Sequence, residues 1–128
     1  MKAIISVALA AGLLIASGAA FAQMAPAKTG DSAKGKVLTD GKGMTLYTFD
    51  KDAGGKSACN GPCATNWPPA LAVDGAKPMG PWTIVTRDDG LKQWAYNGKP
   101  VYAFAKDTKA GDTTGDGFLN GAWHIAKP

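Results

Sequence analysis

Aromatic and polar residues alternate in two short segments of the chain, 46–52 and 101–107, which carry nearly the same order of residue types. Alternation with a period of two is typical of a β-strand, whose successive side chains point to opposite faces. Each copy therefore places two aromatic side chains on one face, Tyr47 and Phe49 in the first and Tyr102 and Phe104 in the second. Each copy also ends in an aspartate, Asp52 or Asp107. The pattern predicts a repeated aromatic strand.

The paired aromatic faces have two interpretations. Large aromatic side chains bury roughly 150–250 Å² each, so two of them on each strand are enough to build a core that both copies share. Alternatively, the rings line a groove that stacks on a ring-shaped ligand. Burial of Tyr47 and Tyr102 would indicate the core, and exposure of the same two rings would indicate the groove.

The rest of the chain predicts further strands that turns separate. The β-rich segments are 37–39, 44–49, 82–86, 91–96 and 101–104, and the turns between them are 40–43, 88–90 and 97–98. Asn97-Gly98 is the strongest hairpin signal, because both residues tolerate a positive φ. Glycine, proline and asparagine interrupt the mature chain before any long amphipathic helix is complete. The sequence predicts an all-β fold, a small single domain of two related hairpin or meander repeats packed on a shared aromatic core.

The predicted domain organisation has three parts. Residues 1–22 are predicted to be a signal peptide, because a positive start, a short apolar run and small residues precede the expected new N-terminus, Gln23. Residues 23–36 are predicted to be a flexible N-terminal arm, since they are rich in Ala, Pro, Lys, Gly and Ser with little periodicity. The remainder, 37–128, is the predicted tandem-repeat domain, with repeat one at about 37–69 and repeat two at about 82–128.

The amount and distribution of charge along the chain limit the kinds of partner that it can bind. The formal net charge of +4 falls to +3 with the signal peptide, and the charged residues are Lys and Asp with one Arg and no Glu. Nucleic-acid binding requires Lys and Arg clustered on one face, and the dispersed charge of this chain argues against it. The apolar run is shorter than the roughly 20 residues of a membrane-spanning helix, so no integral membrane segment is expected after signal removal. The expected location is periplasmic or secreted, with an unknown envelope partner or small ligand.

Two cysteines, Cys59 and Cys63, lie between the two aromatic copies. Cysteines of an exported protein usually become oxidised together, and the Asn-Gly-Pro turn between them brings two Cα atoms close. The sequence therefore predicts a local disulfide. Because the closed loop is short, the bond is expected to rigidify the loop rather than to hold the domain together.

A metal or thiol site is the competing interpretation of the same cysteines. Cys59 and Cys63 as thiolates, joined by the distant His124, would form a ligand set that suits copper or zinc. The disulfide and the metal site make opposite predictions about the redox state of the pair.

Enzymatic chemistry has little support in the residue types. With no Glu and one His, a paired-carboxylate or Ser-His-Asp mechanism would have to use aspartates scattered through turns. The glycine-rich segments match neither a P-loop nor a dinucleotide fingerprint. The sequence therefore indicates a protein that is not an enzyme and that needs no cofactor.

Several spaced motifs agree, in order, with one protein family. These are Tyr-x-Phe-x-x-Asp twice, Cys59-x-Gly61-x-Cys63-Ala64 leading to Trp67-Pro68-Pro69, and Gly111-Asp112-Thr113 leading to Gly117 and Trp123. From about Lys36 onward the chain resembles bacterial secreted-repeat proteins, also described as predicted lipoproteins with the Yx(FWY)xxD motif. The resemblance implies an envelope location and a tandem repeat, and it carries no biochemical activity over. The lipid-attachment cysteine of the lipoprotein members is missing here.

These features together predict an exported cell-envelope protein that acts as a non-catalytic binding or structural module. The alternative is a periplasmic thiol or metal-handling protein that uses Cys59, Cys63 and His124.

Overall fold

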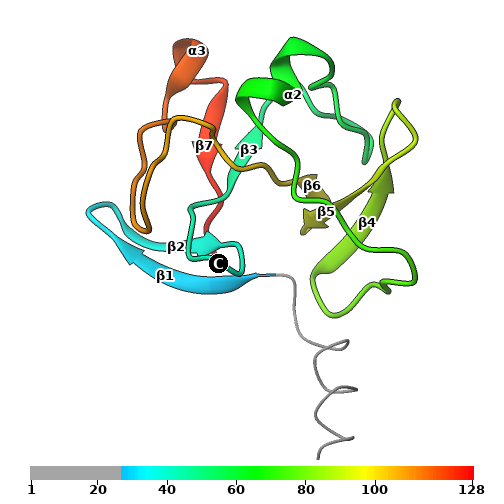
Figure 1. Ribbon diagram of the computed structural model, residues 1–128, viewed down its shortest axis with the longest axis horizontal. Helices are drawn as coiled ribbons and strands as arrows, with labels where there is room; N and C mark the ends of the chain where they lie inside the picture. The colour runs from blue at the N-terminus through cyan, green and yellow to red at the C-terminus, as the bar shows by residue number, and fades with distance from the viewer. Residues whose placement is uncertain (1–26) are drawn as a thin grey trace, which may run out of the picture.

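A computed structural model describes residues 27–128, so the predicted signal peptide and the first residues of the predicted arm lie outside the described part. The elements are β1 (Lys28–Ser32), β2 (Gly35–Thr39), β3 (Tyr47–Phe49), α2 (Pro62–Asn66), β4 (Trp82–Thr86), β5 (Lys92–Tyr96), β6 (Lys99–Pro100), α3 (Phe118–Gly121) and β7 (Trp123–Ile125). Figure 1 shows α2 and α3 at the same end of the molecule, with the β1–β2 hairpin at the opposite end. Neither helix of the described part is long and apolar enough to cross a membrane.

The strands form three small antiparallel sheets, β1–β2, β3–β7 and β4–β5–β6. The predicted all-β class is therefore confirmed. The Asn97-Gly98 turn joins β5 to β6, and Asn97 adopts a φ of 50° as its position in a tight hairpin requires. The strands are short, with five residues at most, and turns rich in glycine and aspartate separate several of them.

The prediction of a flexible arm over 23–36 is wrong for the residues from Lys28 onward. Lys28 pairs with Thr39 and Ser32 with Gly35, so that β1 and β2 form a complete hairpin. The side chains of β1 are exposed or half-buried, and the strand is held by backbone hydrogen bonds. Without a buried face the strand has no hydrophobic alternation, and periodicity could not reveal it.

The two aromatic copies pair with each other at the centre of the molecule. The Tyr47 amide donates to the Tyr102 carbonyl at 2.7 Å, and the Tyr102 amide donates to the Tyr47 carbonyl at 2.9 Å. The pairing relates the two repeats by an approximate two-fold rotation. Matching bonds confirm the relation, since Asp50 donates its amide to the Ala122 carbonyl while Ala105 donates to the Asn66 carbonyl.

Four aromatic rings from both repeats form one continuous stack in the core. Trp67 and Trp123 lie at the centre, with ring centroids 3.8 Å apart and planes at 3°. Phe49 covers Trp123 at 4.2 Å and Phe104 covers Trp67 at 4.0 Å. Each phenylalanine thus stacks on the tryptophan of the other repeat, so the core belongs to both repeats equally.

Each tyrosine of the motif is hydrogen-bonded to the motif aspartate of the other repeat. The Tyr47 hydroxyl donates to Asp107 at 2.7 Å, and the Tyr102 hydroxyl donates to Asp52 at 2.7 Å. The aspartates also accept backbone amides of their own loops, Asp52 from Ala58 and Asp107 from Thr114. We name these two tyrosine–aspartate pairs the cross-repeat latches. They explain why the aspartate stands at a fixed spacing after the aromatic strand.

The opposite face of the repeated strands packs into a second cluster. Leu46 and Val101, the neighbours of the two tyrosines, are buried there against Trp82 and Trp94. The period-two alternation therefore distributes the strand residues between two cores. Tyr47 and Tyr102 are each 0% exposed, so the prediction of a shared core is confirmed and the ligand-stacking groove is wrong.

Truncation of either core tyrosine should destabilise the whole domain. Tyr47→Ala and Tyr102→Ala should each lower the free energy of unfolding by ~3–5 kcal/mol, because each removes a buried ring and a latch. Unfolding should remain a single transition, since neither repeat can bury its aromatic face alone. Denaturant melts followed by tryptophan fluorescence and by circular dichroism test this, and two separated transitions in the wild type would contradict it.

The latches also predict a loss of stability at alkaline pH. Burial, assisted by the hydrogen bonds to Asp107 and Asp52, raises the pKa of both Tyr47 and Tyr102 above the ordinary value of 10.0. Above that pH the unfolded chain ionises these phenols while the folded chain keeps them protonated, so stability should fall as the pH rises past 10. Tyr47→Phe should make this fall shallower by up to about 1.4 kcal/mol per pH unit, measured from urea melts between pH 9 and 11. An unchanged slope would refute the assignment.

Candidate functional site

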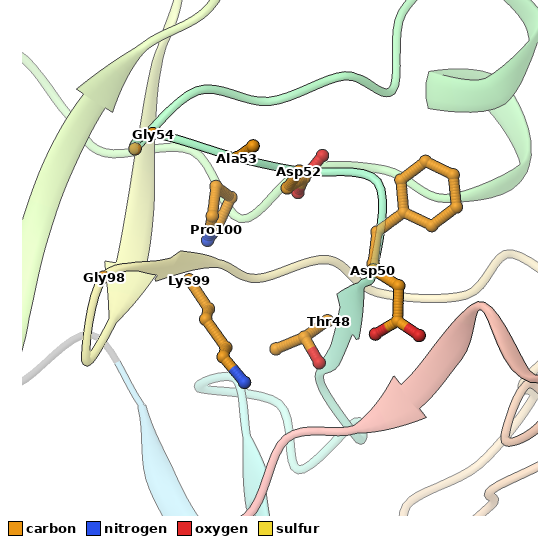
Figure 2. Close-up of a pocket in the computed structure, with 10 residues that line it drawn as sticks. Thr48, Asp50, Asp52, Ala53, Gly54, Gly98, Lys99 and Pro100 are labelled. Atoms are coloured by element: carbon orange, nitrogen blue, oxygen red, sulfur yellow. The ribbon is translucent and has the colours of Figure 1, made fainter.

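Two adjoining hollows lie on the outer face of the strands that carry the aromatic core. Their volumes are about 200 Å³ and about 460 Å³, and Thr48, Asp50 and Lys99 line both of them. The smaller hollow is walled by glycines of the 52–55 and 98–100 segments, and the larger one extends to Tyr96 and His124. Figure 2 shows Thr48 between the side chains of Lys99 and Asp50. We name the two together the polar hollow.

One side-chain hydrogen bond fixes the acidic side of the polar hollow. Nε2 of His124 lies 2.9 Å from Oδ2 of Asp50, and both side chains are about half exposed. His124 sits on β7 directly opposite Thr48 of β3, so backbone pairing sets the position of the ring. On the other side of the hollow, Lys99 makes no salt bridge to any residue of the described part.

The approximate two-fold rotation carries the polar hollow onto a hollow with different chemistry. That counterpart has a volume of about 320 Å³ and a lining that is almost entirely apolar: Leu46, Pro68, Pro69, Ala70, Leu71, Trp94, Ala103 and one charged residue, Asp40. The Ala103 amide donates to the Pro68 carbonyl at the place where Thr48 pairs with His124 in the polar hollow. The two surfaces are built on equivalent backbone.

Four polar residues of the hollow have apolar counterparts at equivalent positions. The pairing of Tyr47 with Tyr102 and of Trp67 with Trp123 sets the equivalences between the two repeats. Lys99 and Met44 are matched further by the glycines that precede them, which have φ of 84° and 85°. Thr48 corresponds to Ala103, Asp50 to Ala105, His124 to Pro68 and Lys99 to Met44. The scaffold therefore folds with either chemistry at these positions. The four polar residues are therefore not needed for the strands to form.

Sequence reasoning identified only His124 among these four residues. The signal that could have identified the others was present, because the copies 46–52 and 101–107 differ at few positions and two of these are Thr48 and Asp50. Lys99 could be recognised only after the hairpin register placed it beside β3.

The cysteines adopt the geometry of the predicted disulfide. Their sulfur atoms lie 2.04 Å apart and their Cα atoms 5.2 Å apart, with Cys59 fully buried and Cys63 packed against the edge of the aromatic core. The equivalent loop of repeat two has Gly115 and Leu119 in their places. A Cβ at Gly115 would lie 2.6 Å from the Trp67 ring, so the stack leaves no room for a side chain there.

The disulfide loop rests on a buried arginine that the sequence reasoning missed. Arg87 is 2% exposed and donates to the Cys59 carbonyl at 2.9 Å, to the Gln93 side chain at 2.9 Å and to the Ser57 hydroxyl at 3.0 Å. The Ser57 hydroxyl in turn lies 2.6 Å from the hydroxyl of Tyr102. Arg87 therefore connects the loop to a cross-repeat latch and acts as a structural residue.

The ligand set of the predicted metal site is not brought together. His124 pairs with Asp50, whereas Cys59 and Cys63 are joined to each other near the core. Residues 27–128 contain no group of three or more His, Cys, Asp or Glu side chains placed to share a metal ion. This arrangement gives the copper or zinc alternative no geometric support.

A family model described as a secreted repeat of unknown function matches the chain twice, at residues 28–71 and 83–127. The two matches coincide with the two halves of the pseudo-symmetric core, and the first begins at β1, within the segment expected to be an arm. No curated protein and no solved structure gives a significant match.

Loss of the disulfide should lower the free energy of unfolding only slightly. The bond closes a loop of only a few residues, so Cys63→Ser should lower the free energy of unfolding by about 2 kcal/mol or less. Gly115→Ala, at the counterpart of Cys59, should cost more, because its new Cβ displaces the Trp67 ring from the stack. Thermal and urea melts of both variants make the comparison. Unfolding of Cys63→Ser together with a neutral Gly115→Ala would show that the disulfide, and not the stack, holds the domain.

Proposed function

The chain belongs to the family of secreted repeats, and we propose that it is an exported, non-catalytic binding module that takes a small polar ligand in the polar hollow. The ligand-contacting residues are Thr48, Asp50, Lys99 and His124. The periplasm or the extracellular space is the proposed location, reached through the signal segment 1–22, so that the mature chain begins at Gln23.

The observation that supports this proposal is the broken symmetry of the two hollows. Equivalent backbone carries Thr48, Asp50 and His124 on one side, and Ala103, Ala105 and Pro68 on the other. The backbone is equivalent at both places, and the apolar residues of the second place show that folding does not require charged side chains there. Polar residues gathered at one hollow alone are therefore best accounted for by a ligand.

The location of the hollow favours binding with little reorganisation. Thr48 alternates with Tyr47 and Phe49 on β3, so the strand that presents the hydroxyl is anchored by two buried rings on its other face. His124 lies between Trp123 and Ile125, which are buried in the same core. Side chains on strands held this firmly keep their geometry before the ligand arrives.

The same geometry favours binding over catalysis. A hydrolytic triad needs a hydroxyl within hydrogen-bond reach of the histidine, which in turn needs a carboxylate on its other nitrogen. Here Nε2 of His124 is directed to Asp50, and within the described residues no hydrogen bond joins the Thr48 hydroxyl to the ring. We therefore assign His124 the role of holding the Asp50 carboxylate in place.

Nuclear magnetic resonance tests the proposal directly. Addition of the small-molecule fraction of a bacterial envelope extract to the ¹⁵N-labelled mature protein should shift the amides of residues 48–50, 98–99 and 124. Asp50→Ala and Thr48→Ala, which copy the residues of the apolar counterpart, should abolish these shifts while changing stability by about 0.5 kcal/mol or less. Lys106→Ala, at an exposed lysine of the other repeat, is the control and should keep them. Shifts confined to other surfaces, or none at all, would refute the assignment.

A further inference from the structure

We infer that the ligand of the polar hollow is a small zwitterion of the amino-acid or short-peptide type, with its ammonium group at Asp50 and its carboxylate at Lys99. This inference rests on the proposed function, because it names the ligand class of the same hollow.

The inference begins with two opposite charges that share one hollow without forming an ion pair. Asp50 and Lys99 both line the two adjoining volumes, and they make no salt bridge with each other. Of the other charged lining residues, Asp52 accepts the Tyr102 hydroxyl and the Ala58 amide, and Lys127 donates to the Lys34 carbonyl. Figure 2 shows their charged ends on either side of Thr48. Two opposite charges separated in this way offer one contact for a cation and another for an anion.

A ligand with a single charge would use only half of this site. A cation that binds at Asp50 is repelled by Lys99, and an anion that binds at Lys99 is repelled by Asp50. A zwitterion meets an opposite charge at each end. Discrimination by complementary charge is a common source of binding specificity, since the wrong partner meets a like charge.

The uncharged parts of the hollow fit a peptide-like ligand. The Thr48 hydroxyl lies between the two charges, where it can bond to the polar atoms that join the two ends of the ligand. Gly54, Gly55 and Gly98 line part of the smaller hollow, where the lack of a side chain leaves room for a ligand. Tyr96 lines the larger one and offers an aromatic surface to a ligand side chain.

His124 orients the carboxylate of Asp50. Its Nε2 lies 2.9 Å from one carboxylate oxygen, Oδ2, and leaves the other oxygen for a ligand. An ammonium group with three donors can bond to that oxygen and to the Thr48 hydroxyl at once. The histidine thereby acts as a positioning residue.

The test compares three peptides of the same diglycine backbone, in which one end charge or the other is blocked. Diglycine carries both charges, N-acetyl-diglycine lacks the ammonium and diglycinamide lacks the carboxylate. In amide-shift titrations diglycine should bind at the polar hollow, and each blocked peptide should bind about tenfold more weakly, which corresponds to about 1.4 kcal/mol.

Two variants assign each charge to its residue. Lys99→Met, which copies Met44, should weaken diglycine about tenfold. It should not weaken diglycinamide, which has no carboxylate to lose and is relieved of the repulsion by Lys99. Asp50→Ala, which copies Ala105, should weaken diglycine but should not weaken N-acetyl-diglycine, which has no ammonium to lose and is relieved of the repulsion by Asp50. Lys106→Met applies the same substitution to the other repeat and should affect none of the three peptides.

The outcomes separate this inference from the proposed function. Equal affinity for all three peptides, or no binding of diglycine, would overturn the inference that the ligand is a zwitterion. If the envelope extract still shifts residues 48–50 in that case, the hollow is a site for another class of ligand. If neither the extract nor the peptides shift these residues, both proposals are wrong.

Discussion

The stacking of Trp67 on Trp123 is the interaction on which the rest of the structure depends. The two rings come from different repeats and lie nearly parallel at 3.8 Å, with a phenylalanine of the opposite repeat covering each of them. Either repeat alone would expose two large rings to water. The tandem pair is therefore the smallest unit that can bury its aromatic residues, and a chain of this length gains one core from two short repeats.

The cross-repeat latches determine how the two repeats are oriented. Each buried tyrosine hydroxyl needs a partner, and the partner is an aspartate that also closes a loop of the opposite repeat. The bonds are reciprocal, so an error in the position of one repeat would leave both hydroxyls unsatisfied. The Tyr-x-Phe-x-x-Asp spacing thus specifies a relation between repeats, although it is written within each of them.

The inward residues and the latches are thus constrained in both repeats, whereas two outward positions next to each aromatic strand are free to vary. The residues that face inward must be aromatic, and those that form the latches must be tyrosine and aspartate. The neighbouring outward positions carry Thr48 and Asp50 in one repeat and Ala103 and Ala105 in the other, on the same backbone. A duplicated scaffold can therefore keep its core while one of two equivalent surfaces acquires charge.

The amino-acid sequence by itself determined the β class, the tandem repeat, the buried faces of the two aromatic strands and the proximity of the two cysteines. These features follow from period-two alternation, turn residues and short loops, which act over a few residues along the chain. Only the tertiary structure decided that Asp50 meets His124, that Lys99 lies beside them, that Arg87 supports the disulfide loop and that β1 is a strand. The first of these contacts joins residues 74 positions apart, and β1 has no buried face. Contacts of this kind depend on how the two repeats dock, and no local pattern of hydrophobic and polar residues encodes them.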